Sequence, residues 1–148
     1  MKAAIYYGRH DLRVMDVEER PVGDNEVKVN VKFCGVCGTD IHIYEGDGGA
    51  AEVVPPTIIG HEFSGVVSEV GKNVKNIKPG DRVSVDPNDM CGECYYCRNA
   101  MAHFCTNAIG YGTTYPGGFA EYVTVRAKQV FRIPDSLPLE SAALVETV

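Results

Sequence analysis

Cysteine, histidine and carboxylate side chains lie close together in the sequence between Cys34 and Glu62. Cys37 comes early in this stretch, and His61 stands directly before Glu62 at its end. A thiolate, an imidazole and a carboxylate form a ligand set that suits zinc. We therefore predict that Cys37 and His61 bind a catalytic Zn²⁺, with a carboxylate completing the site. The alternative is that both are buried packing residues, as a lone cysteine often is.

A second group of cysteines has the spacing C-x2-C-x2-C-x7-C and comprises Cys91, Cys94, Cys97 and Cys105. Four thiolates this close satisfy a closed, tetrahedral zinc site. The surrounding segment has no apolar periodicity and cannot bury enough surface alone, so we predict a structural zinc. An iron–sulfur cluster, a redox pair within one C-x-x-C and buried thiols are the alternatives. We expect His103, between the third and fourth cysteines, to lie on the surface.

The composition is that of a globular protein of 148 residues, long enough for one domain with its own core. The net charge is −6 and the basic residues are scattered, which argues against a nucleic-acid partner. No stretch is long and apolar enough to span a bilayer, and the N-terminus lacks the features of a signal peptide. We therefore predict a cytoplasmic protein without nucleic-acid or membrane partners. In such a protein, six cysteines favour metal binding over disulfide bonds.

Short strands are predicted to position these side chains. The clearest is Glu26–Phe33, which alternates between polar and apolar residues and delivers Cys34 and Cys37 at its C-terminal end. Its predicted core face consists of Val27, Val29, Val31 and Phe33. The other predicted strands are Lys2–Tyr7, Leu12–Val17 with a possible bulge before Met15, Phe63–Val70, Arg82–Val85, Gly117–Val125 and Gln129–Ile133.

Two helices and two irregular segments complete the predicted elements. Thr39–Tyr44 is expected to be a short helix, and Leu139–Val148 the start of another, with Pro138 near its first position. Residues 46–56 form a loop without an assigned role, and Asp86–Ala108 an irregular lobe. With 16 glycines, 8 prolines and many short strands, the sequence favours a small, mainly β barrel or sandwich.

Several motifs, in order along the chain, resemble those of the zinc-dependent medium-chain alcohol and polyol dehydrogenases, which include sorbitol, butanediol and threonine dehydrogenases. Gly35–Asp40 is similar to the first-ligand motif, and Gly60–Val74 to the zinc signature, which Gly80–Val83 continues in the usual way. The four-cysteine segment has the spacing of the structural-zinc lobe, and Gly117–Tyr122 is similar to a strand that re-enters the barrel. The resemblance covers nearly the whole chain. It implies that residues 1–148 form the family's catalytic domain, a GroES-like, partly open β-barrel with short helices and a zinc-binding lobe.

The resemblance also implies the metal ligands. Cys37 and His61 resemble the first two ligands of the catalytic zinc, and the four lobe cysteines resemble those of the structural zinc. Glu62 resembles the adjacent carboxylate, which either ligates the metal or sits behind it. Glu146 falls where a third ligand is placed, although the usual Glu-Pro is Glu146-Thr147 here. The alternative for Glu146 is a solvated carboxylate on a helix.

Three residues that follow Cys37 resemble groups that handle protons or position the metal ligands. Thr39 resembles the hydroxyl that takes the substrate proton, and His42 the imidazole that passes it to solvent. Asp40 resembles the acceptor that orients His61, a common need of a metal-bound imidazole. In such enzymes zinc lowers the pKa of the substrate alcohol, whose hydride then passes to a nicotinamide cofactor.

Cys34 is not assigned to the metal. It forms a C-x-x-C with Cys37, which is the spacing of redox-active pairs. Because Gly-Thr-Asp follows Cys37, the zinc motif fits this spacing better. We expect Cys34 to be a small packing residue at the end of a strand.

A nucleotide-binding fingerprint is missing, because no G-x-G-x-x-G lies between a strand and a helix. We therefore predict a fragment, inactive alone, of a homo-oligomeric NAD- or NADP-dependent dehydrogenase. Its substrate would be a polyol, a secondary alcohol, or an amino alcohol such as threonine. The alternative is a metal-stabilised structural or binding module without activity. The metal-binding cysteines and His61 argue against a zinc-free quinone reductase of the same superfamily.

Overall fold

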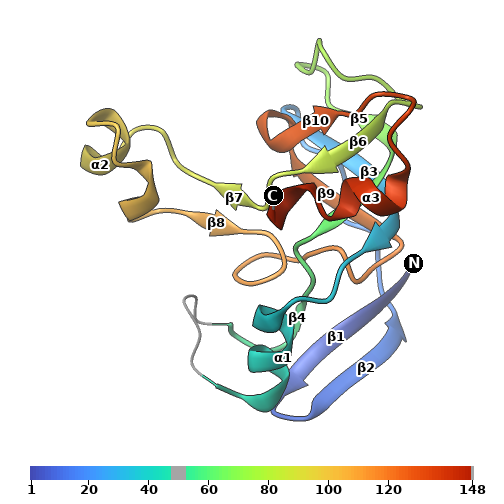
Figure 1. Cartoon of the computed structure of the whole chain (residues 1–148), viewed down its shortest axis with the longest axis vertical. Coiled ribbons are helices and arrows are strands. Elements are labelled where there is room, and N and C mark those ends of the chain that lie inside the picture. The colour runs from blue at the N-terminus through green and yellow to red at the C-terminus, as the bar shows by residue number, and fades with distance from the viewer. Residues whose placement is uncertain (48–52, 148) are drawn as a thin grey trace.

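Antiparallel strands carry the fold of residues 1–47 and 53–147, the part of the chain that the computed structural model describes (Figure 1). The largest sheet has five strands in the order β10-β6-β5-β3-β9. They are β10 (Val130–Arg132), β6 (Arg82–Val85), β5 (Phe63–Val70), β3 (Glu26–Cys34) and β9 (Tyr122–Arg126). Every neighbouring pair in this sheet is antiparallel.

Two smaller sheets complete the strands of the described chain. One has the order β2-β1-β4, with β2 at Asp11–Asp16, β1 at Lys2–Gly8 and β4 at Thr57–Ile58. The other pairs β7 (Asn88–Asp89) with β8 (Ile109–Gly110). The described residues are thus mainly β, as the sequence predicted.

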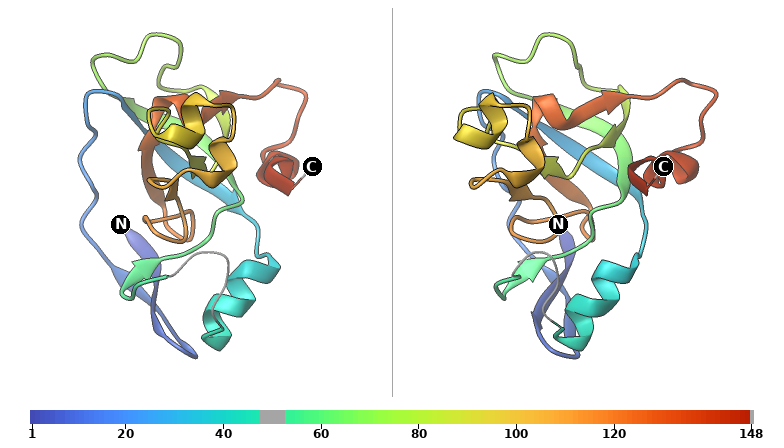
Figure 2. Two further views of the ribbon diagram at one scale, coloured as in Figure 1. Left: turned by 90° about the vertical axis from the view of Figure 1, so that its left-hand side faces the viewer. Right: turned by 60° about the vertical axis from the view of Figure 1, so that its left-hand side comes forward.

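The helices are short. They are α1 (Gly38–Glu45), α2 (Tyr95–Arg98), α3 (Leu139–Ala143), and the 3₁₀ turns Ala102–Phe104, Ala127–Gln129 and Val145–Thr147. In Figure 1, β7 and β8 lead away from the main sheets to α2, which forms a projecting lobe (Figures 1 and 2). None of the described helices has the length and apolar character needed to cross a membrane.

Valines fill the interior of the largest sheet. Val27 and Val29 are fully buried, which confirms the alternation predicted for β3. The same prediction is wrong for Phe33, which is 44% exposed. The pairing of β3 with β5 shifts register between Val31 and Phe33. Because such a bulge exchanges the faces of the residues that follow, Cys34 packs against the core in place of Phe33.

Two further expectations differ from the structure. The bulge predicted before Met15 is wrong, because the β1–β2 register is irregular only between Tyr6 and Gly8, beside the connecting turn. The predicted helix from Leu139 ends at Ala143 and is followed by a 3₁₀ turn. Residues 48–52 of the predicted loop, and Val148, lie outside the described residues.

The strand predicted at Gly117–Val125 begins only at Tyr122. Gly117 and Gly118 instead pass close to the backbone of Gly60, to which Gly118 N donates a hydrogen bond of 2.7 Å. A Cβ atom on Gly117 would lie 2.1 Å from the Gly60 carbonyl oxygen, so only glycine permits this approach. The contact fixes the segment that leads directly into His61.

Helix α1 begins and ends with well-defined caps. Cys37 is the N-cap, and its sulfur accepts a hydrogen bond from Thr39 N at 3.3 Å. Asp40 completes a capping box, because its carboxylate accepts a bond of 3.0 Å from Cys37 N. Gly46 ends the helix in the left-handed conformation, with φ 76°. Two of the predicted site residues, Cys37 and Asp40, therefore also define the start of the helix.

Helix α3 is tied to the sheet by buried hydroxyls. Ser64 on β5 donates to the carbonyl oxygen of Leu139, and Ser84 on β6 donates to that of Ala142 at 3.0 Å. Both serines are buried, and the helix contacts β3, β5 and β6. These bonds fix the position of the chain just before Glu146.

A buried carboxylate joins the projecting lobe to the barrel. Asp89 on β7 has no exposed surface and lies 3.1 Å from Arg126 Nη1 and 2.5 Å from Lys128 Nζ. Lys128 also donates to the carbonyl oxygen of Met90. Because a buried charge is costly without partners, the two cations at the end of β9 hold the base of the lobe.

We predict that Asp89→Asn lowers the free energy of unfolding by about 2 kcal/mol or more, because it leaves two cations facing a neutral amide. Urea unfolding of the zinc-loaded chain measures the effect. Asp16→Asn is the matched control, since Asp16 pairs with Lys2 at an exposed position, where such a pair is worth less than about 1 kcal/mol. Equal losses in the two variants would contradict the proposed role of Asp89.

Candidate active site

The pairing of β3 with β5 brings Cys37 and His61 together. The two strands run antiparallel, with Cys34 opposite Phe63, and Gly35 N donates to the carbonyl oxygen of Glu62 at 2.7 Å. The residues that follow β3 therefore meet those that precede β5. Cys37 Sγ lies 3.0 Å from His61 Nε2.

Three candidate ligands form one compact group. The ligand atoms of Cys37, His61 and Glu62 all lie within 4.8 Å of one another. Glu62 is buried, and its carboxylate fills the space beside Gly35, where a Cβ atom would lie 2.3 Å from it. A thiol, an imidazole and a carboxylate at this spacing fit zinc, although a tetrahedral ion would hold sulfur and nitrogen about 3.5 Å apart. Cys37 and His61 would have to move apart only slightly to bind zinc.

Asp40 lies on the other side of the His61 ring. Its Oδ1 atom is 3.9 Å from His61 Nδ1, and both atoms are buried without a hydrogen-bond partner among the described residues. A small rotation of the ring would let Nδ1–H donate to this carboxylate. Because that tautomer leaves the Nε2 lone pair facing Cys37, the arrangement suits a metal-bound imidazole. Asp40 thus stands where the sequence predicted an orienting group.

Cys34 stays apart from this group, as a free thiol. Burial, aided by the nearby carboxylates of Asp40 and Glu62, raises the pKa of the Cys34 thiol to about 12. Because the thiolate is the reactive form, a thiol held protonated is a poor partner for redox chemistry. The position supports the predicted packing role of Cys34.

A cavity of about 330 Å³ opens beside the metal-ligand group. His61, Thr39, His42 and Glu146 line it. The other lining residues include five that the sequence analysis did not single out, namely Pro87, Asn88, Gly110, Tyr111 and Thr113. The volume lies within the range of small-ligand sites.

Glu146 lies at this cavity but outside the compact group of Cys37, His61 and Glu62. It sits half-buried in the 3₁₀ turn after α3. The structure therefore brings Glu62, and not Glu146, within ligand distance of the thiol and the imidazole. The assignment of Glu146 as a metal ligand stays a prediction.

The four lobe cysteines converge on one point. Their ligand atoms all lie within 4.8 Å of one another, with Cys91 Sγ 3.5 Å from Cys105 Sγ and 3.9 Å from Cys97 Sγ. Zinc–sulfur bonds of about 2.3 Å in a tetrahedron place the sulfurs about 3.8 Å apart. All four are free thiols rather than disulfides. His103 is exposed and outside the group, as expected.

The lobe thiols differ in acidity. The backbone N–H groups of Cys97 and Thr106 lower the pKa of Cys94 to about 6, and the N–H of Cys91 lowers the pKa of Cys105. Desolvation first, and then the neighbouring thiols, raise the pKa of Cys97 to about 12. Four sulfur atoms this close would repel one another as thiolates, and a cation among them would offset that repulsion.

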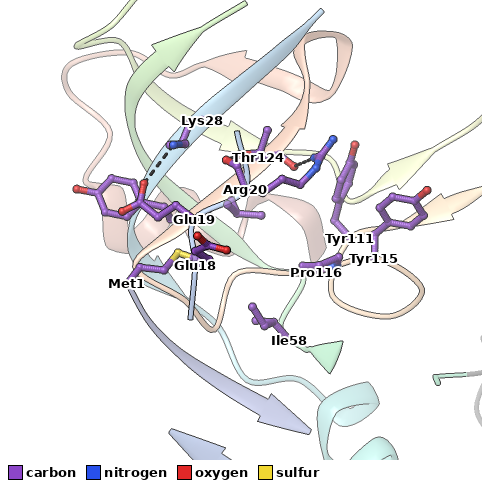
Figure 3. Close-up of a pocket in the computed structure, with 12 residues that line it drawn as sticks. Met1, Glu18, Glu19, Arg20, Lys28, Ile58, Tyr111, Tyr115, Pro116 and Thr124 are labelled. Atoms are coloured by element: carbon purple, nitrogen blue, oxygen red, sulfur yellow. Dashed lines mark hydrogen bonds and ion pairs between the residues drawn. The ribbon is translucent and has the colours of Figure 1, made fainter. Parts of the chain in front are cut away.

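A smaller cavity of about 100 Å³ lies elsewhere on the barrel (Figure 3). Tyr111, Tyr115 and Arg20 are among the residues that line it, and Arg20 donates to the carbonyl oxygen of Thr124 (Figure 3). None of the predicted site residues lines this cavity. The cavity beside His61, which four predicted site residues line, is therefore the candidate active site.

The fold and the thiol–imidazole group agree with a known oxidoreductase domain. Residues 23–135 match the alcohol dehydrogenase GroES-like domain. The chain therefore belongs to this family, which confirms the predicted resemblance and the partly open barrel.

Individual relatives are similar over almost the whole chain. An L-threonine 3-dehydrogenase of Anaeromyxobacter sp. (strain Fw109-5) is 44% identical over 134 residues, which are 90% of this chain and 39% of the relative. The structure of 2R,3R-butanediol dehydrogenase from Bacillus subtilis is 37% identical with a TM-score of 0.86, over 98% of this chain and 44% of that one. A protein described as a short chain alcohol dehydrogenase of Escherichia coli CFT073, in complex with NADH, is 37% identical with a TM-score of 0.89, over 99% of this chain and 42% of that one. The chain thus spans about two fifths of the length of these proteins.

We predict two zinc ions per chain, and only one in a Cys97→Ser variant, which should also melt at a lower temperature. A structural zinc contributes directly to folding free energy, so its loss loosens the lobe. Mass spectrometry of the native protein and thermal melting measure both effects. Cys34→Ser is the matched control and should keep two ions. Bound iron, or a Cys97→Ser variant with unchanged metal and melting, would exclude the zinc lobe.

Proposed function

We propose that this chain is the zinc-binding catalytic domain of an NAD- or NADP-dependent dehydrogenase that oxidises a polyol or another secondary alcohol. The observation that carries the proposal is the position of the cavity. Its wall joins His61, next to two further candidate zinc ligands, to the hydroxyl of Thr39 and the imidazole of His42. Metal ligands and proton-transfer groups thus face one space large enough for a small alcohol.

The candidate ligands have separate tasks in this proposal. Cys37, His61 and Glu62 would hold the zinc, and Asp40 would orient the His61 ring. Zinc bound there would lower the pKa of the substrate hydroxyl and stabilise its anion. Glu146, which also lines the cavity, would face the substrate.

Two residues of α1 would remove the proton of the substrate hydroxyl. Thr39 and His42 are three positions apart, so their side chains are neighbours on one helix face. Thr39 would accept the hydroxyl proton while it donates its own proton to His42. The hydride would pass to a nicotinamide held by a part of the whole protein outside this chain. Oxidation of the alcohol to the ketone then balances reduction of the cofactor.

The charges around the cavity favour certain substrates. None of the described residues that line it is a lysine or arginine, whereas Glu146 is acidic. A phosphate or carboxylate group on the substrate would find no counter-ion on this wall. A neutral diol or polyol, or an amino alcohol whose ammonium group faces Glu146, matches the wall better. Butanediol, named for one relative, is a neutral diol of this class. Threonine, named for another, carries an ammonium group that suits Glu146 but also a carboxylate that this wall does not pair.

Activity of the complete gene product tests the proposal. We expect reduction of NAD or NADP with secondary diols, polyols or threonine, and a loss of roughly 1,000-fold or more in kcat for His61→Ala, because metal assistance is worth several kcal/mol. His103→Ala is the control, since this imidazole is exposed and outside both metal groups. Retained alcohol oxidation in His61→Ala would remove the metal centre from the mechanism.

We also predict that residues 1–148 alone bind zinc but no nicotinamide cofactor. No G-x-G-x-x-G lies between a predicted strand and a predicted helix of the sequence, where the usual cradle for the pyrophosphate forms. Calorimetric titration of the zinc-loaded chain with NAD and with NADP should give no dissociation constant below roughly 1 mM. The complete gene product, titrated in parallel, should bind one of them. Tighter binding by the short chain would show that the cofactor site lies within it.

A further inference from the structure

An acidic residue contacts the imidazole that lines the cavity. His42 Nδ1 lies 3.3 Å from Asp47 Oδ2. An ionised carboxylate can only accept a hydrogen bond, so this contact requires the proton on Nδ1. His42 Nε2 has no hydrogen-bond partner among the described residues. Asp47 therefore selects the tautomer in which Nε2 is free to accept a proton.

The helix cap holds Asp47 in this place. Gly46 adopts the left-handed conformation, and Asp47 N donates a bond of 2.9 Å to the carbonyl oxygen of His42 itself. Backbone and side chain of Asp47 thus both bind the same residue. Although His42 and Asp47 are 65% and 64% exposed, the cap already fixes the backbone of Asp47. Less side-chain freedom is then lost than in an ordinary surface ion pair.

We propose that Asp47 is a positioning residue of the proton path, and this inference rests on the proposed function. Asp47 accepts the Nδ1–H of His42 and directs Nε2 toward the proton that leaves through Thr39. When Nε2 takes that proton, the ring becomes an imidazolium with a proton on each nitrogen. The carboxylate of Asp47 stabilises its charge. The ring then returns one proton to water, which reaches the exposed side of His42.

The tautomer can be measured on the 148-residue chain without cofactor or substrate. Long-range ¹H–¹⁵N NMR of the zinc-loaded chain should show the Nδ1–H form of His42, assigned with a His42→Gln variant. Asp47→Ala should shift the ring toward the Nε2–H form. Glu45→Ala is the matched control on the same helix, because Glu45 pairs with His10 at 2.7 Å. It should change the signals of His10 and leave those of His42 unaltered.

The catalytic effect is measured in the complete gene product. Asp47→Ala should lower kcat roughly 10-fold, less than the roughly 100-fold or more expected for loss of a general acid–base group itself, with KM and zinc content unchanged. Added imidazole buffer should restore part of this rate, because an external base can accept the proton directly. Glu45→Ala should retain the native rate. A merely structural role of Asp47 would not respond to buffer.

The outcomes separate the two proposals. A His42 tautomer that is the same in Asp47→Ala and in the native chain overturns the positioning role. An active native enzyme whose kcat is unchanged by Asp47→Ala, or is not raised by imidazole buffer, overturns it as well. A native gene product that oxidises no alcohol overturns the proposed function, and the positioning role falls with it.

Discussion

The antiparallel register of β3 and β5 is the constraint on which the candidate site depends. With Cys34 opposite Phe63, the end of one strand and the start of the other lie side by side, and Cys37 meets His61 although 24 positions separate them. Because the side-chain period of a strand is two, a slip of one residue would turn every core valine outward. Burial of Val27 and Val29 therefore specifies the same register that assembles the metal ligands. The pairing of β3 with β5 thus determines both the packing of the core and the positions of the candidate ligands.

The two thiol-containing groups differ in how they are supported. Cys37 and His61 are held by a strand pairing and a helix cap, so their positions do not depend on a metal. The lobe cysteines lie on short turns, with backbone N–H groups directed at their sulfurs and only β7 and β8 joining them to the sheets. The predicted four-thiolate zinc site would give such a segment its stability. Asp89 supplies the remaining link, as a buried charge shared by two cations of the barrel.

Much of this arrangement could be predicted from the sequence because it is local. The alternation of Glu26–Phe33, the capped helix after Cys37 and the spacing of the lobe cysteines each depend on neighbouring residues. Contacts between distant parts of the chain could not be predicted in this way. The exposure of Phe33 depends on a bulge between β3 and β5. Asn88 and Thr113 line the cavity only because of where the lobe joins the barrel. The buried serines beneath α3 belong to the same class, since a serine in a strand does not reveal that it binds a distant carbonyl group. Asp47 was missed because its contact depends on the left-handed turn at Gly46.

Helix α1 separates a dry side of the candidate site from a wet one. Asp40 and Ile43 are buried on the side that faces the barrel, whereas Thr39 and His42, each one position earlier, are exposed. Cys37 caps the N-terminal end of this helix. The candidate ligand Cys37, the carboxylate proposed to orient His61 and the two residues proposed to carry the proton thus share eight helical residues and their cap. Because the helix fixes these residues relative to one another, a proton could leave along its exposed side while Asp40 stays shielded from water.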